Sequence, residues 1–237
     1  MPVVVSWTMV AQKGNLMMFR IAALAGLMLI SAGCATTVQR VASVALVPED
    51  NVEKISRELQ SAENAERSGL YLREIDGQTY LFQYSELADH DKNKNFQGLE
   101  NLLYAGSDCM ERIFYEPGAA DKEPEGDVMR IAMFTELKRE KEAHYRLLHD
   151  NPWPDVVAAI RKANFRNFSI FLEEIDGHVY LFGWLEYVGS DIAADDAENK
   201  KDPASIRWWK ETDACQIAPA DAGGGMWGGM KELWFSE

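Results

Sequence analysis

The chain has 237 residues, and its 38 acidic residues outnumber the 24 basic ones, for a formal net charge of −14 at pH 7. So acidic a protein repels nucleic acid and anionic lipid surfaces, and neither is expected as a partner. A neutral small molecule suits it better, and about 200 residues after a leader can bury a sizeable core.

The N-terminus has the features of an export leader. Arg20 precedes an apolar run at 21–30, and small residues come directly before Cys34. This run is shorter than the roughly 20 apolar residues of a membrane-spanning helix, and its single positive charge is typical of a secretory signal. The cysteine makes it resemble a bacterial lipoprotein signal, with an ordinary cleaved signal peptide as the alternative. We expect residues 1–37 to be leader and tether, and the protein to be exported to the cell envelope, held there through lipid at Cys34.

A repeat organises the rest of the chain. Residues 70–86 (LYLREIDGQTYLFQYSE) and 170–186 (IFLEEIDGHVYLFGWLE) are identical at nine of seventeen positions. Each copy consists of two runs of β-forming residues around Asp-Gly, at 76–77 and 176–177. Asp-Gly between such runs is a strong hairpin signal, because a type I′ turn requires positive φ angles. Both copies are therefore predicted to be β-hairpins.

Similar elements flank the two hairpins. The predicted strands and helices around them are 40–47, 49–67 and 110–115 in the first half, and 127–134, 138–162 and 230–235 in the second. A polar segment, predicted to be helical, separates each hairpin from its closing strand. Each half then has the ferredoxin-like order β-α-β-β-α-β. We expect one unit at 38–118, a charged linker at 119–125 and a second unit at 126–237.

The repeat also predicts how the halves pack. A four-stranded antiparallel sheet with helices on one face leaves its other face without a partner. Two copies in one chain can solve this by packing sheet to sheet, so we expect an α+β fold of two tandem ferredoxin-like units that form an intrachain α+β barrel. Two independent domains side by side are the alternative. The barrel reading favours a monomer that mimics a dimer over a homodimer.

The candidate site lies in the predicted helix of the second half. Tyr145 and His149 are four residues apart and share one helix face. Asn-Pro-Trp-Pro follows at 151–154, and its two prolines require the helix to break just after His149. A histidine with a pKa near neutrality suits proton transfer. The structural alternative is a helix-terminal histidine that caps backbone carbonyls.

With these residues in view, the second half resembles the L-rhamnose mutarotase family. The matching residues are Tyr145, His149, NPWP at 151–154, NFSIFL at 167–172, Leu181, Phe182, Glu186, RWWK at 207–210 and the closing KELWF at 231–235. Members of that family are small dimeric α+β barrels that interconvert the anomers of a six-carbon sugar. The resemblance implies an isomerase that opens and closes the ring of L-rhamnose or a related deoxyhexose by general acid/base catalysis. It also implies a monosaccharide as the binding partner and neither a cofactor nor a metal.

The resemblance also implies residue roles. His149 is expected to be the catalytic acid/base, and Tyr145, Phe168, Trp208 and Trp209 are expected to contact the substrate. Phe168 stands where the family has a tyrosine, and the missing hydroxyl bears on which sugar is selected.

Further residues are expected to shape the pocket. These are Trp153 and Asp155 beside the histidine, and Trp227 in a glycine-rich loop at 223–229 that could close as a lid. The segment 189–203 is an insertion relative to the family. The first half has no counterpart of the histidine, NPWP or tryptophan pair, so we expect it to be a structural partner and the chain to have one active pocket. A non-catalytic sugar-binding or structural lipoprotein is the main alternative, and an oxygenase-type member of the wider barrel superfamily is a third.

Overall fold

The computed structural model describes residues 38–59, 67–87, 99–106 and 109–236. The chain divides into Met1–Ala35 and Thr36–Glu237, and every described residue belongs to the second unit. The expected leader and tether, with the lipidation site Cys34, lie outside the described residues. Within these described ranges, no helix is long and apolar enough to cross a membrane.

The first half supplies five strands and one α-helix to the described structure. In chain order its elements are β1 (Gln39–Val47), a 3-10 turn (Glu49–Asn51), α1 (Val52–Leu59), β2 (Arg67–Ile75), β3 (Gln78–Leu87), a second 3-10 turn (Glu100–Leu102), β4 (Ala105–Gly106) and β5 (Glu111–Gly118). The helix predicted for 49–67 is thus too long at its end, because Arg67 already belongs to β2. Arg67 pairs there with Glu86 of β3, so the strand begins before the repeated sequence does.

The second half contains four α-helices and six strands. In chain order its elements are β6 (Met129–Leu137), a 3-10 turn (Arg139–Lys141), α2 (Glu142–Asp150), α3 (Pro154–Lys162), β7 (Phe165–Ile175), β8 (His178–Tyr187), α4 (Ile192–Asn199), α5 (Pro203–Asp213), β9 (Gln216–Ile217), β10 (Gly228–Gly229) and β11 (Lys231–Ser236). The predicted helix break is confirmed. α2 ends at Asp150, and α3 begins with Pro154 in its first turn, where proline's missing N–H costs nothing.

Both Asp-Gly pairs form the predicted hairpin turns. Asp76 and Gly77 have φ angles of 50° and 76°, and Asp176 and Gly177 have 51° and 82°. Positive φ at both central residues is the signature of a type I′ turn, whose twist matches that of the flanking strands. β2 therefore pairs antiparallel with β3, and β7 with β8.

The two closing strands exchange between the halves. One sheet has the order β11-β2-β3-β1-β4 and the other β10-β6-β8-β7-β5. β5 forms where a closing strand was predicted, but it pairs with β7 of the second half. β11 pairs in turn with β2 of the first half. Each sheet therefore contains a strand from both halves, and neither half completes its sheet alone.

The two sheets pack face to face, as the intrachain barrel prediction requires. The core between them is aromatic: Tyr84 stacks on Trp184 with ring centroids 3.8 Å apart, and Phe82 stacks on Phe182 at 5.4 Å. The members of each pair come from equivalent positions of the repeat, one hundred residues apart in the sequence. Trp184 Nε1 also donates to the hydroxyl of Tyr71 at 2.8 Å. Such stacked rings bury large apolar surfaces between the sheets. The two halves are therefore packed together and are not two independent domains.

A buried ion-pair network joins the sheets near one end of this core. Glu186 on β8 is fully buried and accepts from Arg166 Nε and Asn167 Nδ2, each at 2.8 Å. Arg67 on β2 bridges the sheets by pairing with Glu186 and, at 2.7 Å, with Glu86. A buried carboxylate is stable only when its oxygens are satisfied in this way. The network therefore fixes the register between the halves.

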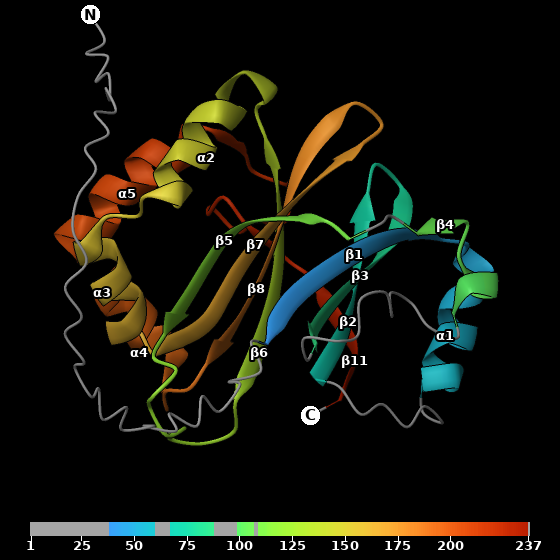
Figure 1. Cartoon of the computed structure of the whole chain (residues 1–237), viewed down its shortest axis with the longest axis horizontal. Coiled ribbons are helices and arrows are strands. Elements are labelled where there is room, and N and C mark those ends of the chain that lie inside the picture. Colours follow the sequence, from blue (N-terminus) through green and yellow to red (C-terminus); the bar gives the residue numbers. More distant parts are fainter. Residues whose placement is uncertain (1–37, 60–66, 88–98, 107–108, 237) are drawn as a thin grey trace, which may run out of the picture. The chain divides into compact units, whose positions relative to one another are not determined.

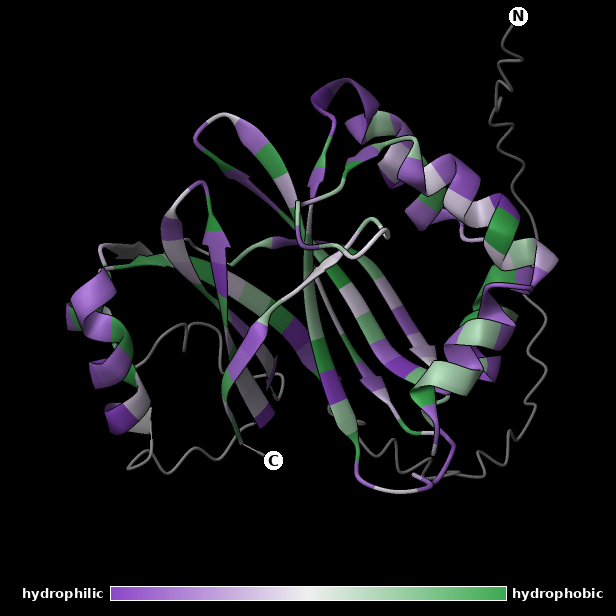
Figure 2. Cartoon of the chain, turned by 180° about the vertical axis from the view of Figure 1, so that it is seen from behind, coloured by the Kyte–Doolittle hydropathy of each residue, from purple (hydrophilic) through white to green (hydrophobic). Residues whose placement is uncertain are grey.

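Helices cover the outer faces of the two sheets. In Figure 1, α2, α3, α4 and α5 lie together against the sheet that contains β7 and β8, while α1 lies on the outer side of the sheet that contains β1 and β3. α1 turns its hydrophobic side toward that sheet (Figure 2), where Ile55 joins a cluster with Leu81 and Leu99. The helices on this side include α2 and α5, which carry Tyr145, His149, Trp208 and Trp209 of the predicted pocket.

Candidate active site

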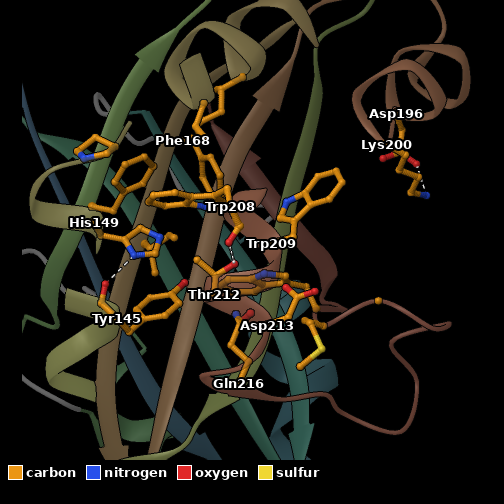
Figure 3. A pocket seen from close by; sticks show the side chains of 18 of the residues that line it. Tyr145, His149, Phe168, Asp196, Lys200, Trp208, Trp209, Thr212, Asp213 and Gln216 are labelled. Carbon is orange, nitrogen blue, oxygen red and sulfur yellow. Dashed lines mark hydrogen bonds and ion pairs between the residues drawn. The ribbon is translucent and has the colours of Figure 1, made fainter. Parts of the chain in front are cut away.

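A cavity of about 460 Å³ lies between β5, β7 and the helices of the second half. Its wall combines aromatic and aliphatic side chains with a few polar groups, and Figure 3 shows most of them: Phe114, Tyr145, His149, Pro152, Val156, Ile160, Phe168, Ile170, Asp196, Lys200, Trp208, Trp209, Thr212, Asp213, Gln216, Gly224, Gly225, Met226 and Trp227. A cavity of this size, mostly apolar with a few converging polar groups, is typical of a small-molecule site.

His149 lies in the last turn of α2 and is held in one orientation by Tyr145, one turn earlier. The two rings stack with centroids 4.1 Å apart, and His149 Nδ1 lies 2.9 Å from the backbone oxygen of Tyr145. A carbonyl oxygen can only accept a hydrogen bond, so Nδ1 carries the hydrogen. Burial lowers the pKa of His149 to about 4, an effect that this hydrogen bond and the charge of Asp150 oppose. At neutral pH the imidazole is uncharged and Nε2 carries a lone pair.

Aromatic rings surround this imidazole. Phe114 and Trp208 each place an edge against it, with centroids 5.2 Å away in both cases. Phe114 also packs edge to face with Phe168 at 5.5 Å. Phe114 belongs to β5 and so comes from the first half of the chain. The strand exchange thus gives the first half a direct part in the cavity, which sequence reasoning missed because it treated that half only as a partner sheet.

A polar group lies where α5 ends and β9 begins. Thr212, Asp213 and Gln216 all line the cavity. Partial burial raises the pKa of Asp213, and the charge of Asp213 is among the smaller causes that raise the pKa of the deeply buried Tyr145. Gln216 is only 3% exposed, and its Nε2 has no hydrogen-bond partner among the described residues. The Thr-Asp pair at 212–213, which follows the RWWK block after Glu211, was the available sequence signal for this group.

The insertion at 189–203 also reaches the cavity. α4 lies within it and contributes Asp196, and Lys200 follows directly after the helix. These two side chains form an ion pair of 2.6 Å one turn apart. The insertion therefore adds a charged segment to a wall that is otherwise largely aromatic.

The structure brings most of the predicted pocket residues together. Tyr145, His149, Phe168, Trp208, Trp209 and Trp227 all line the cavity, although their chemical roles remain predictions. Trp153 and Asp155 do not line it, which corrects the expectation that they form its wall. Trp153 packs its ring against the edge of Trp208 at 5.4 Å, and Asp155 pairs with Arg207 at 2.5 Å on the outer surface.

Among the residues that the structure describes, no group of three or more His, Cys, Asp or Glu side chains is arranged to hold a metal ion. The polar groups that line the cavity include the neutral imidazole of His149, the phenol of Tyr145, the carboxyl of Asp213 and the amide of Gln216. These can donate, accept and transfer protons.

Comparison with known proteins gives a match to the second half. The sequence model of L-rhamnose mutarotase matches residues 130–235. An L-rhamnose mutarotase of Acidiphilium cryptum is 37% identical over 51 residues, which are 22% of this chain and 49% of that protein. One from Oceanobacillus iheyensis is 33% identical over 73 residues, 30% of this chain and 64% of that protein. The chain thus covers about half of the first relative and less than two thirds of the second.

A solved structure with a related arrangement of elements is an anthrone oxidase-like protein. It is 8% identical with a TM-score of 0.45, over 84% of this chain and 92% of that one. A similarity this weak identifies no activity. The match to the family model, in contrast, covers the helix with Tyr145 and His149, the second hairpin, α5 and most of β11. Over residues 130–235, the chain is thus similar to L-rhamnose mutarotases.

Proposed function

We propose that the cavity of the second half interconverts the α and β anomers of an aldose, L-rhamnose or a related deoxyhexose. The observation that carries this proposal is the buried, neutral imidazole of His149, whose Nδ1–H is engaged by Tyr145 and whose Nε2 is left as an acceptor. An acceptor that faces an aromatic cavity suits a sugar, because aromatic rings stack on its C–H faces and the acceptor binds its hydroxyl.

In the proposed reaction, Nε2 of His149 takes the proton of the anomeric hydroxyl. The electrons of that O–H bond form the aldehyde C=O, the bond from C1 to the ring oxygen breaks, and the ring oxygen gains a proton. Rotation about C1–C2 and the reverse steps close the ring with the opposite anomeric configuration. A positioned acid and base accelerate each proton transfer by about 10²–10⁴-fold.

The ring oxygen needs a proton donor, and we assign this to the side of the cavity with Tyr145 and Asp213. Burial raises the pKa of the Tyr145 phenol, so it stays protonated and can donate a hydrogen bond. The raised pKa of Asp213 moves its carboxyl toward the range in which it can carry a proton. Asp213→Asn should therefore slow anomer exchange by about 10²-fold, since it removes the proton carrier but keeps the shape.

Anomer-exchange NMR on L-rhamnose tests the proposal directly. The wild-type protein should exchange the two anomeric signals faster than buffer, and His149→Ala should lose most of this acceleration. His144→Ala is a matched control on the same helix, because His144 is half-exposed, pairs with Glu211 and lies outside the cavity. Equal rates of anomer exchange with the wild type, with His149→Ala and in buffer alone would refute the proposed mutarotase activity.

A non-catalytic sugar-binding protein is the second candidate, and one observation favours it. A histidine with a pKa of about 4 is a weak base, so the same cavity could bind a sugar without accelerating ring opening. Saturable binding of L-rhamnose, seen as chemical-shift changes, together with exchange no faster than buffer would establish this alternative.

We also propose that the protein is an exported lipoprotein and a monomer. The leader-like sequence before Cys34 supports the first, and its test is fatty-acid labelling of wild type against Cys34→Ser in a bacterial host. The pairing of two sheets within one chain supports the second, because each sheet already has its partner. A light-scattering mass of twice the chain would contradict the monomer.

A further inference from the structure

Gln216 occupies a rigid position at the edge of the cavity. Its strand β9 pairs with β6, with Gln216 opposite Leu137. The preceding residue, Cys215, accepts a backbone hydrogen bond from Lys138 at 2.8 Å. Side chains alternate along a strand, and the next residue, Ile217, is 44% exposed while Gln216 is 3% exposed. The backbone therefore holds the Gln216 side chain inward.

The Gln216 amide is buried without the partner that such a group normally has. Its Nε2 is shielded from solvent and makes no hydrogen bond within the described part of the chain. Most buried polar side-chain atoms in native proteins are hydrogen-bonded, and one that is not calls for an explanation. Because Gln216 lines the cavity beside Asp213 (Figure 3), a bound ligand can supply the missing acceptor.

The neighbouring groups define what that acceptor is. A sugar hydroxyl both accepts and donates, so it can accept from the Gln216 amide and also pair with the carboxyl group of Asp213, three residues earlier in the same wall, whether or not that carboxyl carries a proton. A carboxylate ligand would instead be repelled by the net charge of −14 of this strongly acidic protein. The pair thus suits a neutral polyol.

We propose that Gln216 is a specificity-determining residue of this cavity, and that its amide N–H donates to one particular hydroxyl oxygen of the bound sugar. The inference rests on the proposed function, and it names the residue that reads the hydroxyl pattern. A site built to hydrogen-bond a hydroxyl rejects analogues that lack it, because the amide is then left unpaired again. Phe168 carries no hydroxyl in the same wall, which increases the dependence of recognition on Gln216.

The test measures binding, not turnover. L-rhamnose and its monodeoxy derivatives are titrated into wild type and Gln216→Leu, with chemical shifts giving the dissociation constants. Gln216→Leu should bind L-rhamnose about tenfold more weakly, the loss expected for one good hydrogen bond. One monodeoxy derivative should bind wild type and Gln216→Leu equally, because it lacks the hydroxyl that the amide reads.

Thermal stability separates a ligand-binding amide from a structural one. An unpaired buried amide destabilises the free protein, so Gln216→Leu should keep or raise the melting temperature while it weakens binding. Ser43→Ala is the matched control, since Ser43 Oγ is also buried and unpaired among the described residues but lies away from the cavity lining. It should leave sugar affinity unchanged.

Failure of this inference is distinct from failure of the proposed function. Equal affinity of wild type and Gln216→Leu for every sugar tested overturns the role of Gln216, whatever the exchange rate. A large drop in melting temperature with the loss of binding assigns Gln216 a structural role and also overturns it. Gln216-dependent binding without accelerated anomer exchange supports the inference and refutes the enzyme.

Discussion

Lowering the pH from 7.5 to 5 should destabilise the native protein through His149. Burial lowers its pKa to about 4 from the ordinary value of 6.5. Between these two values the unfolded chain binds a proton that the native state does not, so the free energy of unfolding falls as the pH falls. The difference between the two pKa values corresponds to about 3 kcal/mol in the free energy of unfolding. About 2 kcal/mol of this stability is lost between pH 7.5 and 5.

Urea denaturation of wild type and His149→Gln at both pH values isolates this contribution. The carboxylates titrate in both proteins and their effect cancels in the comparison. On going from pH 7.5 to 5, the free energy of unfolding of the wild type should therefore fall by about 2 kcal/mol more than that of His149→Gln. In NMR titrations of the histidine ring protons, His149 should have its midpoint near 4. His178 donates a hydrogen bond to the Glu136 carboxylate, which raises the pKa of its imidazole, so it should titrate above 6.5 in the same spectra. A midpoint for His149 at or above 6.5 would refute the neutral base.

Further predictions concern the links between the two halves. Phe114→Ala should lower the free energy of unfolding by about 3 kcal/mol and slow anomer exchange, because the buried ring packs against His149. Unfolding and exchange assays on one preparation check both effects, and unchanged exchange would contradict a role in the site. Arg67→Met should cost about 3 kcal/mol by leaving buried Glu186 without one of its partners, measured by urea denaturation. Arg73→Met should cost less than about 1 kcal/mol, since its carboxylate partner is exposed, and equal losses would argue against the buried network.

Local sequence patterns predicted the hairpins and the break after α2, because single residues decide them. Asp-Gly at 76–77 and 176–177 allows the positive φ angles, and the prolines around Trp153 end α2 and begin α3. The partners of β5 and β11 were not predictable in the same way. Both are short alternating strands, and nothing in such a pattern specifies which of two similar sheets the strand joins.

In the candidate site too, the residues that depend on local sequence were predicted and those that depend on long-range contacts were missed. Tyr145 and His149 were found because helix spacing alone puts them on one face. Phe114 was missed because its place in the cavity depends on the strand exchange, a contact between distant parts of the chain. Gln216 was missed because its burial depends on the pairing of β9 with β6, and two-residue strands leave almost no pattern in a sequence.

The pairing of β11 with β2 determines when, during synthesis of the chain, the first sheet can be completed. The first sheet contains β1, β2 and β3, which are synthesised early, but β2 keeps an open edge until Lys231–Ser236 pairs with it. Those are the last described residues of the chain, so this sheet cannot close during synthesis of the first half. An open strand edge can recruit other chains. Nascent and C-terminally truncated chains would therefore share the same exposed edge of β2.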